Sequence, residues 1–114
     1  ASLAHFTGQA LSATDAPDSV DVWSALLGHS VRGRRKLVEQ SATLSLREGP
    51  WKYIAPHKGP GLNKATNIET GNDPAPQLYH LTDDPGEQRN LAAEQQARTD
   101  EMRKSLEVIR GSFD

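Results

Sequence analysis

Three short stretches, in a fixed order, most strongly limit the fold that this chain can adopt. Residues 43–54 alternate apolar and polar side chains on both sides of Glu48-Gly49-Pro50, which is typical of two strands joined by a tight turn. Residues 77–81 predict another strand, and residues 83–91 predict a capped helical turn that leads into a long helix. We therefore expect an α+β fold in which a small antiparallel sheet of about four strands packs on a long C-terminal helix.

The first 41 residues predict two short N-terminal helices and one further strand. Residues 1–8 have the pattern of a helix end, with Gly8 placed as its C-terminal cap. A second short helix is expected to begin at a cap formed by Asp18 or Ser19 and to end at Gly28. Residues 37–41 predict the strand that completes the sheet.

The C-terminal helix, expected over residues 92–110, has one apolar face. Its members are Met102, Leu106, Ile109 and Phe113. Burying each of these side chains stabilises the fold by roughly 1.5–3 kcal/mol at most. Because one helix covers only one face of a sheet, we expect the other face to be apolar and to pack against a larger neighbour. Without that neighbour, the chain should expose an apolar patch or bury it by self-association.

Length and composition exclude several classes of protein. The 114 residues suffice for one domain, so a single domain over residues 1–114 is expected. A net charge of -2 gives no general attraction for nucleic acid. No apolar run approaches the roughly 18 residues that cross a bilayer, so no membrane partner is expected and the chain should be soluble as given. The absence of cysteine excludes a disulfide framework or a thiolate metal site.

The start of the chain predicts that it is a fragment of a longer protein. There is no initiator methionine, and the first helix has an end but no room for a beginning. A thin core agrees with this interpretation, because hydrophobic residues make up only 35% of the chain.

Residues 55–76 form a long loop that is the best candidate for contact with a ligand. His57, Lys58 and Lys64 can donate hydrogen bonds to sulfate or phosphate oxygens. A loop of this length inside a small domain is usually either functional or disordered. A mobile surface hairpin with no ligand explains the composition equally well, so both interpretations stay open.

Three other groups of residues favour structural roles over functional ones. The basic stretch 32–36 is expected to be a solvated loop that enters a strand, and Trp51 is expected to anchor the core instead of stacking on a sugar ring. A metal site would need the group His80, Asp83, Asp84 and Glu87. Helix capping and turn formation already account for Asp84 and Glu87, so no metal site is predicted in this chain.

The order and spacing of these motifs resemble the C-terminal part of arylsulfatase-type sulfatases, enzymes of the alkaline-phosphatase superfamily. The resemblance extends from about residue 1 to residue 110. It rests on the helix end before Gly8, Asp18-Ser19 with Leu27-Gly28, Gln40-Ser41, Leu46-Arg47 with Gly49, Trp51-Lys52-Tyr53-Ile54, Leu78-Tyr79 with Leu81, Asp84-Pro85 with Glu87, and Asn90-Leu91-Ala92. The family then implies a subdomain that packs on an N-terminal catalytic domain and lends loops to the rim of its substrate cleft.

The resemblance also implies the chemistry of the parent enzyme, which would hydrolyse a sulfate ester on a small molecule or glycan. Sulfatases use calcium and a formylglycine made from Cys or Ser in a Cys/Ser-x-Pro-x-Arg motif. This chain has no cysteine, and no serine stands two places before any of its prolines. We therefore expect no catalytic residue, no cofactor and no activity in these 114 residues. His57 and Lys58 are the candidate substrate-binding residues.

Two other classes of function stay open. The chain could be the C-terminal part of a related phosphonate or phosphodiester hydrolase, or a stand-alone module that binds a carbohydrate or a partner protein. No nucleophile-elbow pattern Gly-x-Ser-x-Gly is present. The sequence does not fix the location of the protein, although a sulfatase parent is compatible with export to the periplasm or the medium.

Overall fold

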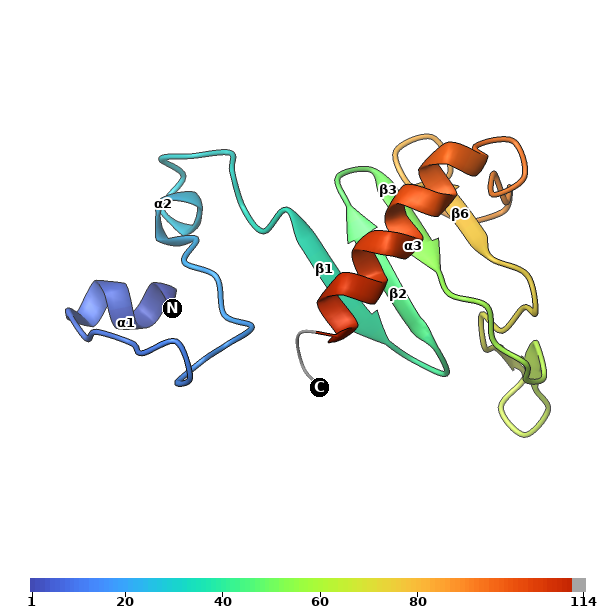
Figure 1. Ribbon diagram of the computed structural model, residues 1–114, viewed down its shortest axis with the longest axis horizontal. Helices are drawn as coiled ribbons and strands as arrows, with labels where there is room; N and C mark the ends of the chain where they lie inside the picture. Colours follow the sequence, from blue (N-terminus) through green and yellow to red (C-terminus); the bar gives the residue numbers. More distant parts are fainter. Residues whose placement is uncertain (112–114) are drawn as a thin grey trace. The chain divides into compact units, whose positions relative to one another are not determined.

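The computed structural model describes residues 1–111, and the chain divides into two compact units, residues 1–35 and the part from Lys36 onward (Figure 1). The prediction of a single domain over residues 1–114 stays a prediction. None of the helices in residues 1–111 is long and apolar enough to cross a membrane.

Two short helices make up the regular structure of the first unit. Helix α1 spans Ser2–Thr7 and ends, as expected, at Gly8, whose φ of 70° is the left-handed conformation that glycine adopts readily. Helix α2 spans Trp23–Leu26. Its predicted cap is wrong, because the Asp21 carboxylate, and not Asp18 or Ser19, accepts a hydrogen bond from the Trp23 amide at 2.9 Å.

The second unit contains the predicted antiparallel sheet. Its strands are β1 (Lys36–Gln40), β2 (Leu44–Glu48), β3 (Trp51–Ile54) and β6 (Gln77–His80), in the spatial order β1-β2-β3-β6. The predicted tight turn joins β2 and β3, and Gly49 adopts a φ of 57° there. The α+β prediction is confirmed in its strand number, its strand direction and its short N-terminal helices.

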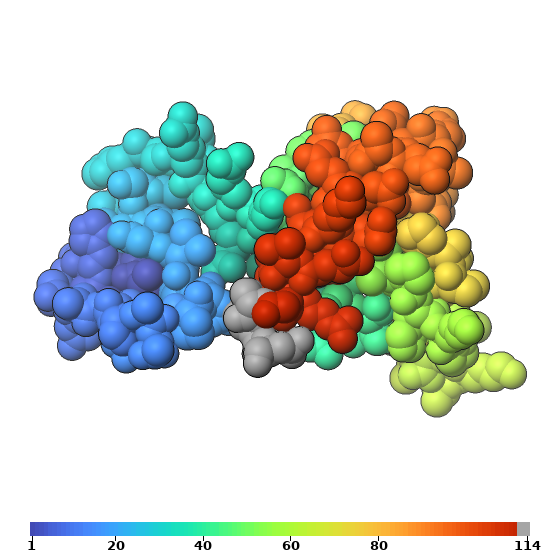
Figure 2. Space-filling model, in the orientation of Figure 1, coloured from blue at the N-terminus to red at the C-terminus, as the bar shows by residue number. Residues whose placement is uncertain are grey.

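Helix α3 (Gln96–Gly111) covers one face of this sheet (Figures 1 and 2). Strand pairing places Leu46, Tyr53 and Leu78 side by side on that face, and Met102 and Leu106 of the helix pack against them. All five side chains are buried. The helix begins four residues later than expected, and the predicted contribution of Phe113 lies outside the described residues.

The opposite face of the sheet is not the apolar surface that the sequence led us to expect. Pairing places Leu37, Arg47 and Lys52 in one row on that face, so two charged side chains lie next to each other at its centre. Ile54 and Tyr79 share the face but are buried. The docking of this face on a larger neighbour therefore stays a prediction, and most of the exposed large apolar side chains of the described residues lie outside the sheet.

Two stretches of the predicted loops have more regular structure than expected. Within residues 55–76, β4 (Leu62–Asn63) and β5 (Ile68–Glu69) form a small antiparallel hairpin. The predicted capping box at Asp84 is wrong. The Asp84 carboxylate accepts from the Gln88 and Arg89 amides at 3.0 and 2.8 Å, and so closes a turn instead of starting a helix.

Glu87 has a different role from the one expected of a capping box. Its backbone adopts a φ of 53°, which a non-glycine residue rarely does, so it cannot continue a helix. Its carboxylate contacts the Lys52 ammonium at 2.6 Å instead of reaching back to the start of the turn. This half-buried ion pair joins the turn to strand β3.

Asn90 connects the end of this turn to strand β6. Its side-chain oxygen accepts from the amides of Leu78 and Ala92, both at 3.0 Å, and its amide group donates to the Pro76 carbonyl at 3.2 Å. The Leu91 amide also donates to the Leu78 carbonyl at 2.8 Å. The segment before α3 therefore occupies the outer edge of β6.

The Asp84 turn should make stability depend on pH in the acid range. Hydrogen bonds from the Gln88 and Arg89 amides lower the pKa of Asp84 below its usual value. Because the pKa of Asp84 is lower in the folded state than in the unfolded state, the ionised carboxylate stabilises the fold. This stabilisation is complete above the unfolded-state pKa of about 3.9 and is lost as pH falls through the folded-state pKa. We expect Asp84→Asn to lower the free energy of unfolding at pH 7. Below about pH 4, the free energy of unfolding of this variant should fall less steeply with decreasing pH than that of the wild type.

Urea unfolding at a series of pH values measures this effect. Glu39→Gln is the matched control, because it also removes one negative charge, from an exposed residue of β1. If the free energy of unfolding fell equally steeply below about pH 4 for the wild type and for Asp84→Asn, the turn would not stabilise the fold as described.

Candidate functional site

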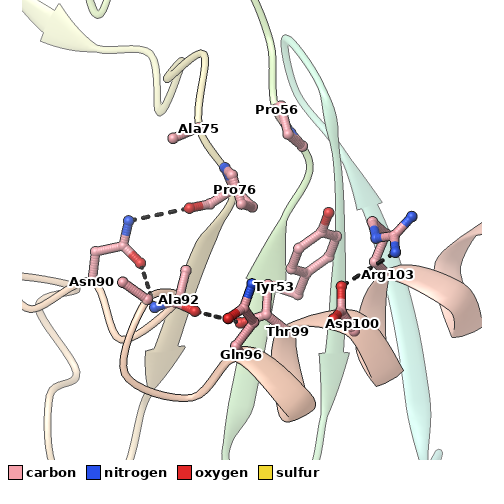
Figure 3. A pocket seen from close by; sticks show the side chains of 11 residues that line it. Tyr53, Pro56, Ala75, Pro76, Asn90, Ala92, Gln96, Thr99, Asp100 and Arg103 are labelled. Carbon is pink, nitrogen blue, oxygen red and sulfur yellow. Dashed lines mark hydrogen bonds and ion pairs between the residues drawn. The ribbon is translucent and has the colours of Figure 1, made fainter.

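Two adjacent hollows lie where strand β3 ends beside α3. The first has a volume of about 340 Å³ and the second of about 360 Å³. They share Tyr53, Pro56 and Arg103 in their walls. Figure 3 shows the first hollow, with Tyr53 reaching from β3 toward the helix and Asp100 and Arg103 on the helix beside it. Because the two share a wall, we treat them as one groove, which we call the Tyr53 groove.

Tyr53 sits at the centre of the groove with its ring in the core. Its side chain is almost fully buried, and burial raises the pKa of its hydroxyl above the usual value, although nearby Arg103 opposes the change. The phenol is therefore neutral at physiological pH and can donate or accept a hydrogen bond.

Arg103 is held in place by two carboxylates. Its guanidinium contacts Asp100 at 3.2 Å and Glu107 at 3.3 Å. The hydrogen bond to Asp100, followed by the charge of Glu107, raises the pKa of Arg103 above its already high value, so the guanidinium stays charged. Since two acids already offset this charge, the centre of the groove suits a polar, largely uncharged group better than an isolated anion.

Of the two predicted site residues, the structure brings only His57 to the groove. His57 lines the second hollow, together with Arg103 and Arg110. Its Nδ1 lies 2.9 Å from the Asn72 side-chain oxygen, and its backbone amide donates to the Asp73 carbonyl at 2.8 Å. These contacts fix the two ends of the 55–76 loop to each other. Lys58 is exposed on the adjoining surface and is not among the residues that line the groove.

A tight contact at Gly59 supports the same loop base. A Cβ atom at Gly59 would lie 2.7 Å from the Asn72 side-chain nitrogen, so a larger residue there would displace Asn72. Asn72 also donates to the Pro60 carbonyl at 3.2 Å. The base of the loop is thus built around the Asn72 side chain, while Lys64 lies beyond it, between β4 and β5.

Sequence analysis missed most of the groove. The sequence indicates Tyr53 only as a strand residue, and an arginine on a helix four residues before an acid, such as Arg103, usually belongs to a solvated surface pair. Residues of the 55–76 loop and of the helix meet at the end of β3. That meeting depends on how far the helix extends along the sheet, which periodicity alone does not give.

The acidic group around His80 does not form a metal site in the described structure. Within residues 1–111, no three His, Cys, Asp or Glu side chains converge closely enough to hold a metal ion. His80 Nδ1 lies 2.6 Å from an Asp83 carboxylate oxygen, but the two atoms do not have the geometry of a hydrogen bond.

Trp51 has the structural role that its sequence position indicated. It packs at the edge of the core, with the His80 ring 4.6 Å from it and the Arg98 guanidinium 5.5 Å from its ring centre. With His80 and Arg98 packed around it, Trp51 is an anchor between sheet and helix.

Comparison with known proteins defines the class to which this sequence and fold correspond. No family model matches the chain. An N-acetylgalactosamine-6-O-sulfatase from Bacteroides thetaiotaomicron is 38% identical to it over 112 residues, which are 96% of this chain and 22% of that protein. A solved sulfatase structure described under the metabolism of multiple glycosaminoglycans by the same organism superposes with a TM-score of 0.91. It is 38% identical, and the match covers 96% of this chain and 23% of that one.

In sequence and in fold, the chain is therefore similar to sulfatases. More particularly, this chain has the sequence and fold of the C-terminal part of a sulfatase, and it spans less than a quarter of the length of the relatives that it matches. The alternatives of a phosphonate or phosphodiester hydrolase and of a stand-alone binding module are not favoured by these matches.

Proposed function

We propose that this chain is the C-terminal structural and cleft-rim part of a sulfatase whose parent polypeptide hydrolyses sulfate esters. The observation that carries the proposal is the match over 96% of the chain, in sequence and in structure, to sulfatases from one organism. By analogy with the relative's name, the substrate class is a sulfate ester of an amino sugar, either as a small molecule or within a glycan. An exported parent would agree with such a substrate.

The reactive groups of the proposed enzyme belong to the N-terminal catalytic domain of the same parent. Sulfatases require calcium and a formylglycine, and the residues of this chain fit neither. The sequence contains no cysteine and no Ser-x-Pro-x-Arg motif, and within residues 1–111 no cluster of three metal-ligating side chains exists. We therefore assign no step of the reaction to this chain and propose that it supports and shapes the cleft.

The 55–76 loop is the proposed contribution to the rim. His57 is held at the base of the loop by Asn72, while the Lys58 side chain is exposed to solvent. An ammonium group beside a fixed imidazole can donate to sulfate oxygens of a bound sugar without meeting the scissile bond. Such contacts are made equally in the ground state and in the transition state, so they should act on KM and not on kcat.

Substitution of Lys58 tests this role in the parent enzyme. We expect Lys58→Met to raise KM for a sulfated amino sugar by about 3- to 10-fold with kcat unchanged, because one exposed charge-assisted contact is worth about 1 kcal/mol. Lys64→Met is the matched control, since it removes the same charge between β4 and β5. An unchanged KM for Lys58→Met, or an equal rise for Lys64→Met, would contradict the proposed contact.

The proposal as a whole is tested by comparing two polypeptides. The coding sequence ahead of Ala1 should encode several hundred residues that include a Cys/Ser-x-Pro-x-Arg motif. The longer polypeptide should then release sulfate from a 6-O-sulfated N-acetylgalactosamine, while the 114-residue chain should release none. Sulfate release by the purified 114-residue chain, with contamination excluded, would overturn the proposal.

A further inference from the structure

The exposed apolar side chains of the molecule are concentrated in residues 1–35. Leu3 is 72% exposed, Phe6 64%, Leu26 64% and Val31 fully exposed. In the same unit, all of which the structure describes, no apolar side chain is buried, and Ser2 is the only buried residue. By contrast, the core of the second unit contains the buried residues of β2, β3, β6 and α3. Residues 1–35 thus carry apolar surface without a core of their own.

A unit of this size cannot be stabilised by its own apolar contacts. Below about 40 residues, chains generally need disulfides, a metal or association with another body. This chain has no cysteine, and residues 1–111 contain no cluster of metal-ligating side chains. Association with another body is therefore the remaining way to bury this surface.

Polar contacts nevertheless hold α1 and α2 in a defined arrangement. The Val22 amide donates to the Ser2 hydroxyl at 2.8 Å, and His5 Nδ1 lies 2.6 Å from an Asp21 carboxylate oxygen. The rings of Phe6 and Trp23 pack with centroids 4.6 Å apart. These contacts join the two helices while Leu3, Phe6 and Leu26 keep most of their surface in solvent. Exposed apolar side chains gathered on a helix pair of defined geometry are typical of a protein–protein interaction site.

We infer that residues 1–35 form the docking surface through which this chain attaches to the body of the parent sulfatase, with Leu3, Phe6 and Leu26 as its apolar contacts. The inference rests on the proposed function, and it assigns the attachment to this unit instead of the sheet. The size of the missing body supports this occupant, because more than three quarters of each matched sulfatase lies outside the region similar to this chain. A second copy of the chain, or its own residues from Lys36 onward, would be the competing occupants.

Hydrogen exchange followed by mass spectrometry tests the inference on two polypeptides, the longer parent and the 114-residue chain. Peptides within residues 1–31 should exchange at least about 10-fold more slowly in the parent, because docking closes their local opening. Peptides of α3 should exchange at similar rates in both, since their core is complete without the parent. Equal exchange of residues 1–31 in both polypeptides would overturn the inference.

Two variants of the parent separate this surface from exposed apolar residues in general. Leu26→Asp should restore fast exchange across residues 1–31, whereas Val108→Asp, at a residue of α3 that is 74% exposed, should not. Equal effects of the two variants would overturn the assignment to residues 1–35. Concentration-independent protection of residues 1–31 in the 114-residue chain would instead show that its own second unit covers them, and concentration-dependent protection would show a second copy. Either result would overturn the inference.

Sulfate release, measured separately, distinguishes the two proposals. A parent that releases sulfate but leaves residues 1–31 unprotected would retain the proposed function and lose the docking surface. A parent that protects residues 1–31 but cleaves no sulfate ester would retain the docking surface and lose the function. A reading frame limited to these 114 residues would overturn both.

Discussion

Replacing Leu46 with alanine is expected to lower the free energy of unfolding of the second unit by about 2–5 kcal/mol. Leu46 is completely buried in the centre of the sheet face that α3 covers, between Val38 and Tyr53 in the strand pairing. Truncation removes apolar contacts and leaves a cavity that the sheet cannot close. Since small domains are stable by only about 5–15 kcal/mol, the variant should approach unfolding at ordinary temperature. Urea unfolding followed by circular dichroism measures the change.

Leu62→Ala is the matched control for this prediction. It is the same substitution, made in strand β4, where the side chain is 42% exposed. We expect the control to change the unfolding free energy by less than about 1 kcal/mol. Similar losses at Leu46 and Leu62 would mean that the sheet and helix do not form the core described here.

Trypsin should cut between Arg32 and Arg35 about 10³-fold faster than at the arginines of α3. The backbone of residues 31–35 contains no helix or strand, so cleavage there requires almost no unfolding. Cleavage at Arg98 or Arg103 requires opening of a helix packed on the core. An opening free energy of about 4 kcal/mol reduces the population that trypsin can cleave by about 10³-fold. Time-resolved mass spectrometry of the digest measures both rates.

The arginines of α3 serve as an internal control, because their side chains are also exposed. The relative exposure of the side chain is 43% for Arg98 and 46% for Arg103, so access to the side chain does not explain the expected difference. The product that begins near Lys36 should retain its sheet and helix by circular dichroism. Early cleavage at Arg98 or Arg103 would contradict the autonomy of the second unit.

The elements that could be predicted from sequence are those specified by local chemistry. Alternation around Gly49-Pro50 identified the β2–β3 hairpin, and the spacing of Met102 and Leu106 identified the buried face of the helix. Gly8 ended a helix as expected, because few other residues adopt a positive φ at so little cost. In each case a few neighbouring residues determine the result.

The errors fall where distant residues decide the local structure. Glu87 followed the sequence pattern of a capping box, but the Lys52 side chain on β3 binds its carboxylate, and its backbone adopts a different conformation. Likewise, the groove at Tyr53 forms because the 55–76 loop and α3 meet at the end of one strand. Sequence periodicity carries no information about contacts between residues 35 or 50 positions apart, so neither feature could be predicted.

The way in which Asn90 and Leu91 occupy the outer edge of β6 has a consequence for polymerisation. An unpaired outer strand can recruit a strand from another molecule and so begin a fibril. Here the hydrogen-bonding positions at Leu78 are already filled by this segment, and the opposite outer strand, β1, carries the charged residues Lys36 and Glu39. Growth of the sheet by addition of strands is therefore disfavoured at both borders.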